Sequence, residues 1–173
     1  MDEMRRYDPT VSGASAATVG AQAPEFILTS LDGVSLQLAQ LRGRVVVLDL
    51  MAMWCETCLG ELEHLRGLRM EAYGGSCEVV VVDVDDRESG VALDAFRKAG
   101  RYPFHFAIDT DQLLEKFGVQ FVPTVLVIDP QGVIRFRSAN VSVPLESLAL
   151  LIDALLEGTT AAAVPRGHRR GKA

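Results

Sequence analysis

The stretch RVVVLDLMAMWCETC, residues 44–58, decides the fold and contains two of the three cysteines of the chain. From Val45 it is a run of β-branched and other apolar residues, interrupted only by Asp49. A run that does not alternate between apolar and polar positions is typical of a strand buried on both faces of a sheet. The stretch ends with Cys55 and Cys58, two residues apart and directly behind Trp54. This pair is compatible with a redox couple, with half of a metal site, or with two small buried residues.

The order of apolar segments and turn residues around this stretch predicts an α/β fold. Strands that alternate with helices form a largely parallel sheet covered on both faces, and a terminal hairpin adds an antiparallel edge. The expected elements are a hairpin at 26–38 with an Asp-Gly turn, the central strand at 44–50, a helix from Leu59 to near Gly74, a strand at 77–85, a helix at 90–99, a strand at 104–109, a helix at 110–118, a hairpin at 123–138 with an Asp-Pro-Gln-Gly turn, and a helix at 144–158.

The length of 173 residues fits one domain with a proper core. We expect this domain to span residues 21–157. Residues 1–20 are rich in small and polar side chains and predict a flexible arm, whereas residues 158–173 end in PRGHRRGKA and predict a disordered basic tail.

Charge and hydropathy exclude several classes of function. The net charge of −6 disfavours nucleic acid as a partner, because phosphate binding needs a concentrated positive face. No stretch approaches the ~20 consecutive apolar residues of a membrane span. The N-terminus lacks the apolar core of a signal peptide, so the sequence as written predicts a cytoplasmic protein, and an extracytoplasmic or periplasmic one if a leader was removed. Three cysteines are too few for a disulfide scaffold.

The position of the cysteine pair favours redox chemistry. Cys55 follows a central strand and opens the next helix, where unpaired backbone N–H groups favour negative charge and lower the pKa of a thiol. The spacing puts both sulfurs on one helical turn, with Cys58 deeper than Cys55. We therefore expect Cys55 to be the nucleophile and Cys58 the cysteine that resolves the mixed disulfide.

Four segments make the sequence similar to a known family: GAQAPEFILTSLDG, LRGRVVVLDLMAMWCETC, VVVVDVDD and FGVQFVPTVLVIDPQGVI. Together they resemble the TlpA/ResA-type thiol–disulfide oxidoreductases, redoxins of the AhpC/TSA type, from about residue 20 to about residue 157. The resemblance implies a thioredoxin-like fold: a central mixed sheet flanked by helices, an N-terminal β-hairpin, and an inserted helix and strand before a cis-proline. That proline is Pro123, which the family's geometry places beside the cysteine pair. A cis bond there turns the backbone of Val122 toward an incoming peptide, and Trp54 shields the thiols or contacts the substrate.

Disulfide exchange also needs a group that takes the proton of the deeper cysteine. Two acids match family positions: Asp49, six residues before Cys55, and Glu61, three after Cys58. The alternative for Asp49 is a strand-end aspartate bonded to nearby backbone, and for Glu61 a solvated acid in the first turns of the helix.

Several positions depart from the family pattern. Met51 and Met53 replace the usual aromatic pair, Thr57 replaces a proline before the second cysteine, and Glu63 replaces a helix-kinking proline. Glu56, inside the motif, adds a negative charge that opposes the effect of the helix end on Cys55. The redox potential is therefore not carried over from the family.

Metal binding is the alternative function. Met51, Met53, Cys55 and Cys58 form a set of soft ligands of the kind that Cu(I) accepts, whereas two cysteines alone do not close a zinc site. Two methionines in such a position are more often core filling than ligands.

Three further patterns receive other interpretations. A peroxidase on this fold carries proline and Thr or Ser before its reactive cysteine, where this chain has Leu48 and Ala52. Cys77 is interpreted as a structural thiol. Asp83, Asp85 and Asp86 are expected in a solvated loop.

The sequence thus predicts a monomeric thiol–disulfide oxidoreductase without a cofactor. Its expected partners are protein or small thiols and disulfides, together with an unidentified electron donor or acceptor.

Overall fold

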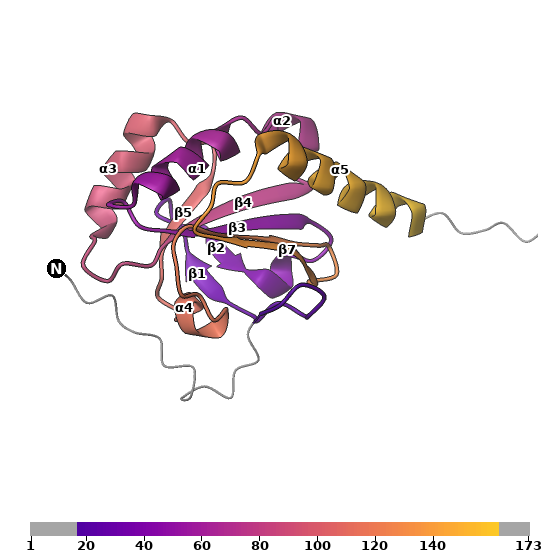
Figure 1. Cartoon of the computed structure of the whole chain (residues 1–173), viewed down its shortest axis with the longest axis horizontal. Helices are drawn as coiled ribbons and strands as arrows, with labels where there is room; N and C mark the ends of the chain where they lie inside the picture. Colours follow the sequence, from indigo (N-terminus) through magenta and orange to yellow (C-terminus); the bar gives the residue numbers. More distant parts are fainter. Residues whose placement is uncertain (1–16, 163–173) are drawn as a thin grey trace, which may run out of the picture.

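A five-stranded mixed sheet forms the centre of the molecule, in a computed structural model that describes residues 17–162 (Figure 1). The strand order is β5-β4-β3-β6-β7, so the apolar run of the CxxC stretch is the central strand β3, parallel to β4 and antiparallel to β6. The elements in chain order are β1 (Ile27–Thr29), β2 (Ser35–Gln37), the 3-10 helix η1 (Leu38–Leu41), β3 (Val45–Met51), α1 (Glu56–Arg66), α2 (Met70–Tyr73), β4 (Cys77–Asp83), α3 (Gly90–Gly100), β5 (His105–Ile108), α4 (Leu113–Lys116), β6 (Thr124–Ile128), β7 (Ile134–Ala139) and α5 (Leu145–Ala162).

Two apolar cores lie on the two faces of this sheet. Successive side chains of a strand point to opposite faces, so Val47 and Met51 of β3 pack on one face and Leu48 and Leu50 on the other. The first face is covered by α1, α3 and α5, and the second by the β1–β2 hairpin, η1 and α4 (Figure 1). Every residue of β3 is buried, as its unbroken apolar pattern predicts.

Both predicted hairpins and the predicted order of strands are present. β1 and β2 pair as a separate two-stranded sheet, and β6 and β7 form the antiparallel edge. The inserted helix and strand are α3 and β5, which lie in the chain between β4 and the proline before β6.

The helix expected from Leu59 to near Gly74 is the main error, because it is broken into α1 and α2. Gly67 ends α1, with its N–H donating to the carbonyl oxygens of His64 and Leu65. A Cβ atom at this position would lie 2.4 Å from a methyl carbon of Leu145. The start of α5 therefore occupies the space beside Gly67, and the leucine periodicity could not reveal this contact.

The predicted helix at 110–118 is reduced to the single turn of α4. Its N-terminal amides are bound by Asp109, whose carboxylate accepts hydrogen bonds from the N–H groups of Leu113 and Leu114. The helix begins later than expected because Gln112, the residue before it, has a left-handed backbone conformation with a φ of 58°.

The predicted terminal segments lie mostly outside the described residues, namely 1–16 and 163–173, and the domain limits remain a prediction. Within the described part, Ala17 is buried and its carbonyl oxygen accepts a hydrogen bond from Arg137. α5 continues to Ala162. No helix among residues 17–162 is both long and apolar enough to cross a membrane.

Candidate active site

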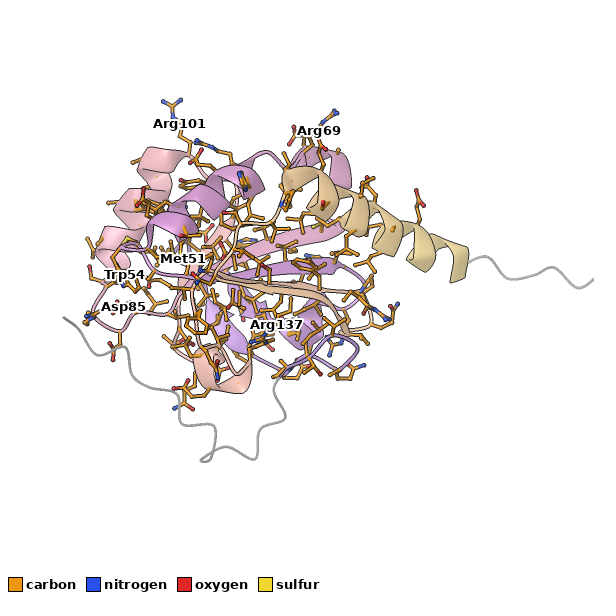
Figure 2. All side chains as sticks on the ribbon, in the orientation of Figure 1. Met51, Trp54, Arg69, Asp85, Arg101 and Arg137 are labelled. Carbon is orange, nitrogen blue, oxygen red and sulfur yellow. A yellow bond between two sulfur atoms is a disulfide. The ribbon has the colours of Figure 1, made fainter. Side chains whose placement is uncertain are left out.

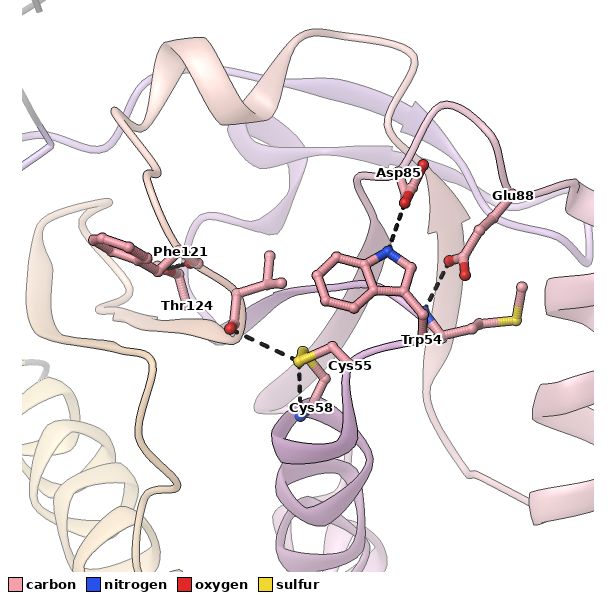
Figure 3. Close-up of a disulfide and its surroundings, with 9 residues drawn as sticks. Trp54, Cys55, Cys58, Asp85, Glu88, Phe121 and Thr124 are labelled. Carbon is pink, nitrogen blue, oxygen red and sulfur yellow. Dashed lines mark hydrogen bonds between the residues drawn. A yellow bond between two sulfur atoms is a disulfide. The ribbon is translucent and has the colours of Figure 1, made fainter. Parts of the chain in front are cut away.

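A disulfide joins Cys55 and Cys58 at the N-terminus of α1 (Figure 3). Cys55 is the N-cap residue, and its Sγ accepts a hydrogen bond from the backbone N–H of Cys58 at 3.2 Å. The two Cα atoms are 5.2 Å apart. Cys55 is 7% exposed, whereas Cys58 is fully buried. The structure thus brings the two sulfurs together with the predicted difference in depth, since only Cys55 is open to another molecule.

A groove runs past the exposed side of the disulfide, between the start of α1 and the segment before β6. The Val122–Pro123 peptide bond is cis, and the carbonyl oxygen of Val122 lies 3.7 Å from Sγ of Cys55. The groove has a volume of about 290 Å³ and is lined by Trp54, Cys55, Glu56, Thr57, Phe121, Val122 and Asn140. The predicted substrate-contacting residues Trp54 and Val122 therefore share one surface with Cys55, and Pro123 lies next to it in the chain.

The loop between β4 and α3 holds the residues just before Cys55. The indole N–H of Trp54 donates to Oδ2 of Asp85 at 2.5 Å, and the backbone N–H of Met53 donates to Oε2 of Glu88 at 2.8 Å (Figure 3). No role for Glu88 was predicted from the sequence. The acidic run after the fourth strand was the available signal, because loops at the carboxyl ends of neighbouring parallel strands meet at one edge of a sheet.

Asp49 is buried in the middle of β3 with no hydrogen-bond partner for either carboxylate oxygen. It lies between Val47 and Met51 on the strand face that α1 covers, which is also the face of Cys58. Burial raises the pKa of Asp49 well above its ordinary value, and the nearby Glu61 carboxylate adds to this rise. The alternative of an aspartate bonded to nearby backbone is therefore wrong.

Glu61 is also buried, one turn after Cys58 on the inner side of α1. One oxygen, Oε2, accepts a hydrogen bond from the backbone N–H of Val143 at 2.8 Å, and Oε1 has no partner. Burial raises the pKa of Glu61, although the Val143 hydrogen bond opposes the rise. The alternative of a solvated glutamate is wrong, because the segment before α5 covers this turn.

Asp83, expected in a solvated loop, is instead buried as the last residue of β4. Burial raises the pKa of Asp83 to about 8, and the neighbouring Glu88 carboxylate adds to this rise. Oδ1 of Asp83 accepts a hydrogen bond from the N–H of Asp85 at 3.0 Å. Asp83 lies within the strand predicted at 77–85, and the expectation of a solvated side chain failed because β4 is buried up to this last residue.

The remaining candidate ligands do not gather into a site of His, Cys, Asp and Glu. Among the described residues, no group of three or more such side chains could hold a metal ion. Met51 is fully buried in the core, whereas Met53 is partly buried against it. The Cu(I) hypothesis, which depends on these methionines, stays a prediction.

Cys77 is a buried free thiol at the first position of β4. Burial raises the pKa of Cys77 to about 12, with a smaller contribution from the charge of Glu78. A thiol with such a pKa carries almost no thiolate at neutral pH, which agrees with a structural role.

Comparisons with known proteins give related sequences and structures. The family model described as the AhpC/TSA family matches residues 19–137. "Thiol-disulfide oxidoreductase ResA" of Bacillus subtilis (strain 168) is 31% identical over 127 residues, which are 73% of this chain and 70% of that protein. The protein of the same name from Bacillus cereus (strain ATCC 10987 / NRS 248) is 29% identical over 127 residues, 73% of this chain and 72% of that protein.

Solved structures confirm the predicted thioredoxin-like arrangement. A putative thiol:disulfide interchange protein DsbE from Chlorobium tepidum superposes with a TM-score of 0.68 at 28% identity, covering 82% of this chain and 99% of its own. A putative protein disulfide isomerase from Bacteroides thetaiotaomicron gives a TM-score of 0.73 at 23% identity, covering 84% and 94%.

Proposed function

The chain belongs to the AhpC/TSA family, and we propose that it exchanges disulfides with protein or small thiol partners through the motif WCETC, residues 54–58. The enzyme is a thiol–disulfide oxidoreductase, the class for which its curated relatives are named. The observation that carries the proposal is the disulfide at the start of α1, with Cys55 on the groove and Cys58 beneath it.

The exchange needs only two sulfurs and a partner. In the direction of substrate reduction, the Cys55 thiolate attacks a substrate disulfide, one substrate thiolate leaves, and a mixed disulfide forms. Cys58 then attacks Sγ of Cys55, loses its proton and releases the second substrate thiolate. The substrate gains two electrons and the enzyme becomes the disulfide. In the reverse direction, a substrate dithiol reduces this disulfide, and no cofactor takes part in either direction.

Asp49 and Glu61 are the proposed proton-transfer groups for Cys58. Both are buried, both have a raised pKa, and both lie on the β3–α1 face where Cys58 is buried. A protonated Asp49 gives its proton to the Cys58 thiolate when the enzyme disulfide opens. A deprotonated Asp49 takes that proton back when Cys58 attacks.

Val122, Pro123 and Trp54 are the proposed substrate-binding residues. The Val122 carbonyl oxygen lies beside Cys55 and is placed to accept a hydrogen bond from an extended peptide. Trp54 is 56% exposed and lines the same groove, so its ring offers an apolar contact.

The direction of electron flow follows from the redox potential. A redox potential close to that of thioredoxin, about −270 mV, would indicate a reductase, which suits the cytoplasmic location that the sequence favours. A far more positive value would indicate an oxidant. The electron donor or acceptor, the location and the monomeric state remain predictions.

Two cysteine variants and a redox titration test the proposal. We expect Cys58→Ser to accumulate a mixed disulfide with substrate through Cys55, and Cys55→Ser to form none. We expect the wild-type pair to titrate as one two-electron couple against glutathione. A Cys58→Ser protein that captures no thiol or disulfide partner would contradict the proposal, as would a pair that glutathione cannot reduce in the folded state.

A further inference from the structure

The exposed aromatic side chains of the described residues mark both sides of the groove. Trp54 and Phe121 are 56% and 49% exposed, and they are the aromatic members of the exposed large apolar set. Figure 3 shows them on opposite sides of the disulfide. An extended polypeptide laid across Cys55 would therefore meet an apolar surface before and after its own cysteine.

The groove also has a charge of one sign. Among residues 17–162, Glu56 is the only charged residue that lines it, and it follows Cys55 directly. Within the part of the chain that the structure describes, no arginine, lysine or histidine forms an ion pair with Glu56. Glu56 is exposed, so its carboxylate is accessible to a positively charged group of a bound substrate.

The loop that holds Trp54 extends this negative charge. Of the acids at residues 83–88, Asp83 is buried with a pKa raised to about 8, so the negative charge comes from Asp85, Asp86 and Glu88. The one base of this segment is Arg87, whose guanidinium binds Asp85. The Arg87 hydrogen bonds hold the pKa of Asp85 below its usual range, so Asp85 stays ionised beside the indole of Trp54. Figure 2 shows Arg69 and Arg101 projecting from the outer helical layer, away from Trp54 and Asp85.

We propose, on the basis of the oxidoreductase function proposed above, that the groove selects polypeptide segments in which the reacting cysteine lies beside a lysine or an arginine. Glu56 is then a specificity-determining residue. It stands next to the attacking sulfur, so a cation next to the substrate sulfur comes within reach of its carboxylate. The two aromatic walls bind side chains without regard to charge, so discrimination rests on Glu56 and is sensitive to salt.

A different account of Glu56 is structural. An acidic residue in the first turn of a helix is favoured by the helix dipole, whatever substrate is bound. That account predicts a loss of stability when the charge is removed and no change in the choice of substrate. The two accounts are therefore separable by rates measured with substrates that differ only in charge.

The experiment uses three short peptides with one cysteine each, identical except for lysine, glutamine or glutamate after the cysteine. Each cysteine is blocked as a mixed disulfide with mercaptoethanol, which is uncharged. The reduced protein is mixed with each peptide, and release of the peptide thiol is followed by chromatography. Rates are divided by the rate with bis(hydroxyethyl) disulfide, which corrects for any change in the reactivity of Cys55 itself.

Glu56→Gln and Glu56→Lys are compared with Glu71→Lys. Glu71 lies in the first turn of α2 and is exposed. The Glu71→Lys substitution changes the net charge of the protein by the same amount as Glu56→Lys. It follows the C-terminal end of α1, whose 11 residues span about 16 Å from the groove.

For the wild type we expect the lysine peptide to react about threefold faster than the glutamine peptide, and the glutamine peptide about threefold faster than the glutamate peptide. The lysine peptide then reacts about tenfold faster than the glutamate peptide. Glu56→Gln should reduce this ratio to about two, Glu56→Lys should invert it, and Glu71→Lys should preserve it. High salt should bring the wild-type ratio close to one.

Equal ratios in the wild type and in Glu56→Lys would overturn the inference while leaving the proposed function intact, provided that bis(hydroxyethyl) disulfide is still reduced. If the reduced wild type reacts with none of these disulfides, the proposed function fails and the inference fails with it. The same peptides with serine in place of cysteine give a second measurement, because their binding changes Trp54 fluorescence without any exchange. They should show the same order of affinity.

Discussion

Two buried aspartates on neighbouring strands of one sheet have opposite surroundings. Asp129, at the end of β6, accepts hydrogen bonds from the N–H groups of Gln131 and Val133 and from the guanidinium of Arg135. Asp49, in the centre of β3, accepts none. They are 4% and 0% exposed, so burial does not distinguish them. The two residues differ in the hydrogen-bond donors around them. The Asp129 carboxylate is surrounded by donors and stabilises a turn, whereas the Asp49 carboxyl group has no donors, favours its protonated form and is able to exchange that proton.

The largest expected effect is on catalysis, from Asp49→Asn. The amide fills the same space but cannot exchange a proton with Cys58, so we expect disulfide exchange at pH 7 to slow by about a hundredfold. The rate with bis(hydroxyethyl) disulfide measures this. An unchanged rate would place Asp49 outside the chemistry and remove the contrast with Asp129.

The same variant should change the pH dependence of stability. The pKa of Asp49 is raised in the folded protein, so its stabilising contribution is complete at low pH and is lost as pH rises through the folded pKa. Urea unfolding at several pH values should show a smaller fall in the free energy of unfolding for Asp49→Asn than for the wild type.

Asp129→Ala should have the opposite pattern. Removing the acceptor leaves two backbone N–H groups and the Arg135 guanidinium without their partner, and we expect a loss of about 2–3 kcal/mol in urea unfolding. The exchange rate of the folded protein should stay within about twofold of wild type. Loss of activity without loss of stability would show that the two aspartates do not divide the roles as inferred.

Glu61→Gln tests whether the second buried acid acts like Asp49. We expect about tenfold slower exchange, because Asp49 remains as a proton-transfer group. Glu63→Gln is the matched control on the same helix, since Glu63 is exposed and binds Arg66 and Tyr102 at the surface. Its exchange rate should stay near wild type, and equal losses in both variants would assign the effect to the helix rather than to the buried acid.

The smallest effect is expected for Asp83→Asn. The pKa of Asp83 is raised to about 8, so wild-type stability should fall as pH rises from about 4 to about 8, and the variant should lack this part of the fall. The resulting difference in melting temperature is about 2–4 °C for each kcal/mol.

Trp54 is the only tryptophan of the chain, so its fluorescence reports the loop through Asp85. If the Trp54 emission of the wild type does not change between pH 7 and pH 9, the titration of Asp83 does not affect the loop that binds Trp54.

The sequence predicts the sheet, both hairpins and the cysteine pair because each has a local signal. The apolar run of residues 45–50 indicates a central strand, and the position of Cys55 after that strand indicates a helix cap. The break at Gly67 and the burial of Glu61 have no local signal, since the first depends on Leu145 at the start of α5 and the second on Val143 just before it, both about 80 residues away. Asp49 was identifiable as a buried acid, but only the structure reveals that it lacks donors.

The proposed proton-transfer role of Glu61 links the protonation of the site to the segment before α5, because the backbone N–H of Val143 donates a hydrogen bond to this carboxyl group. Asn140, at the start of this segment, lines the groove, and Val143 touches the buried acid. An ionised Glu61 holds the amide more tightly than a neutral one, because a charge-assisted hydrogen bond is stronger. We therefore expect the rate of amide hydrogen exchange at Val143 to differ between the oxidised and the reduced protein. The mobility of the segment 140–143 beside the groove would then depend on the protonation state of the thiols.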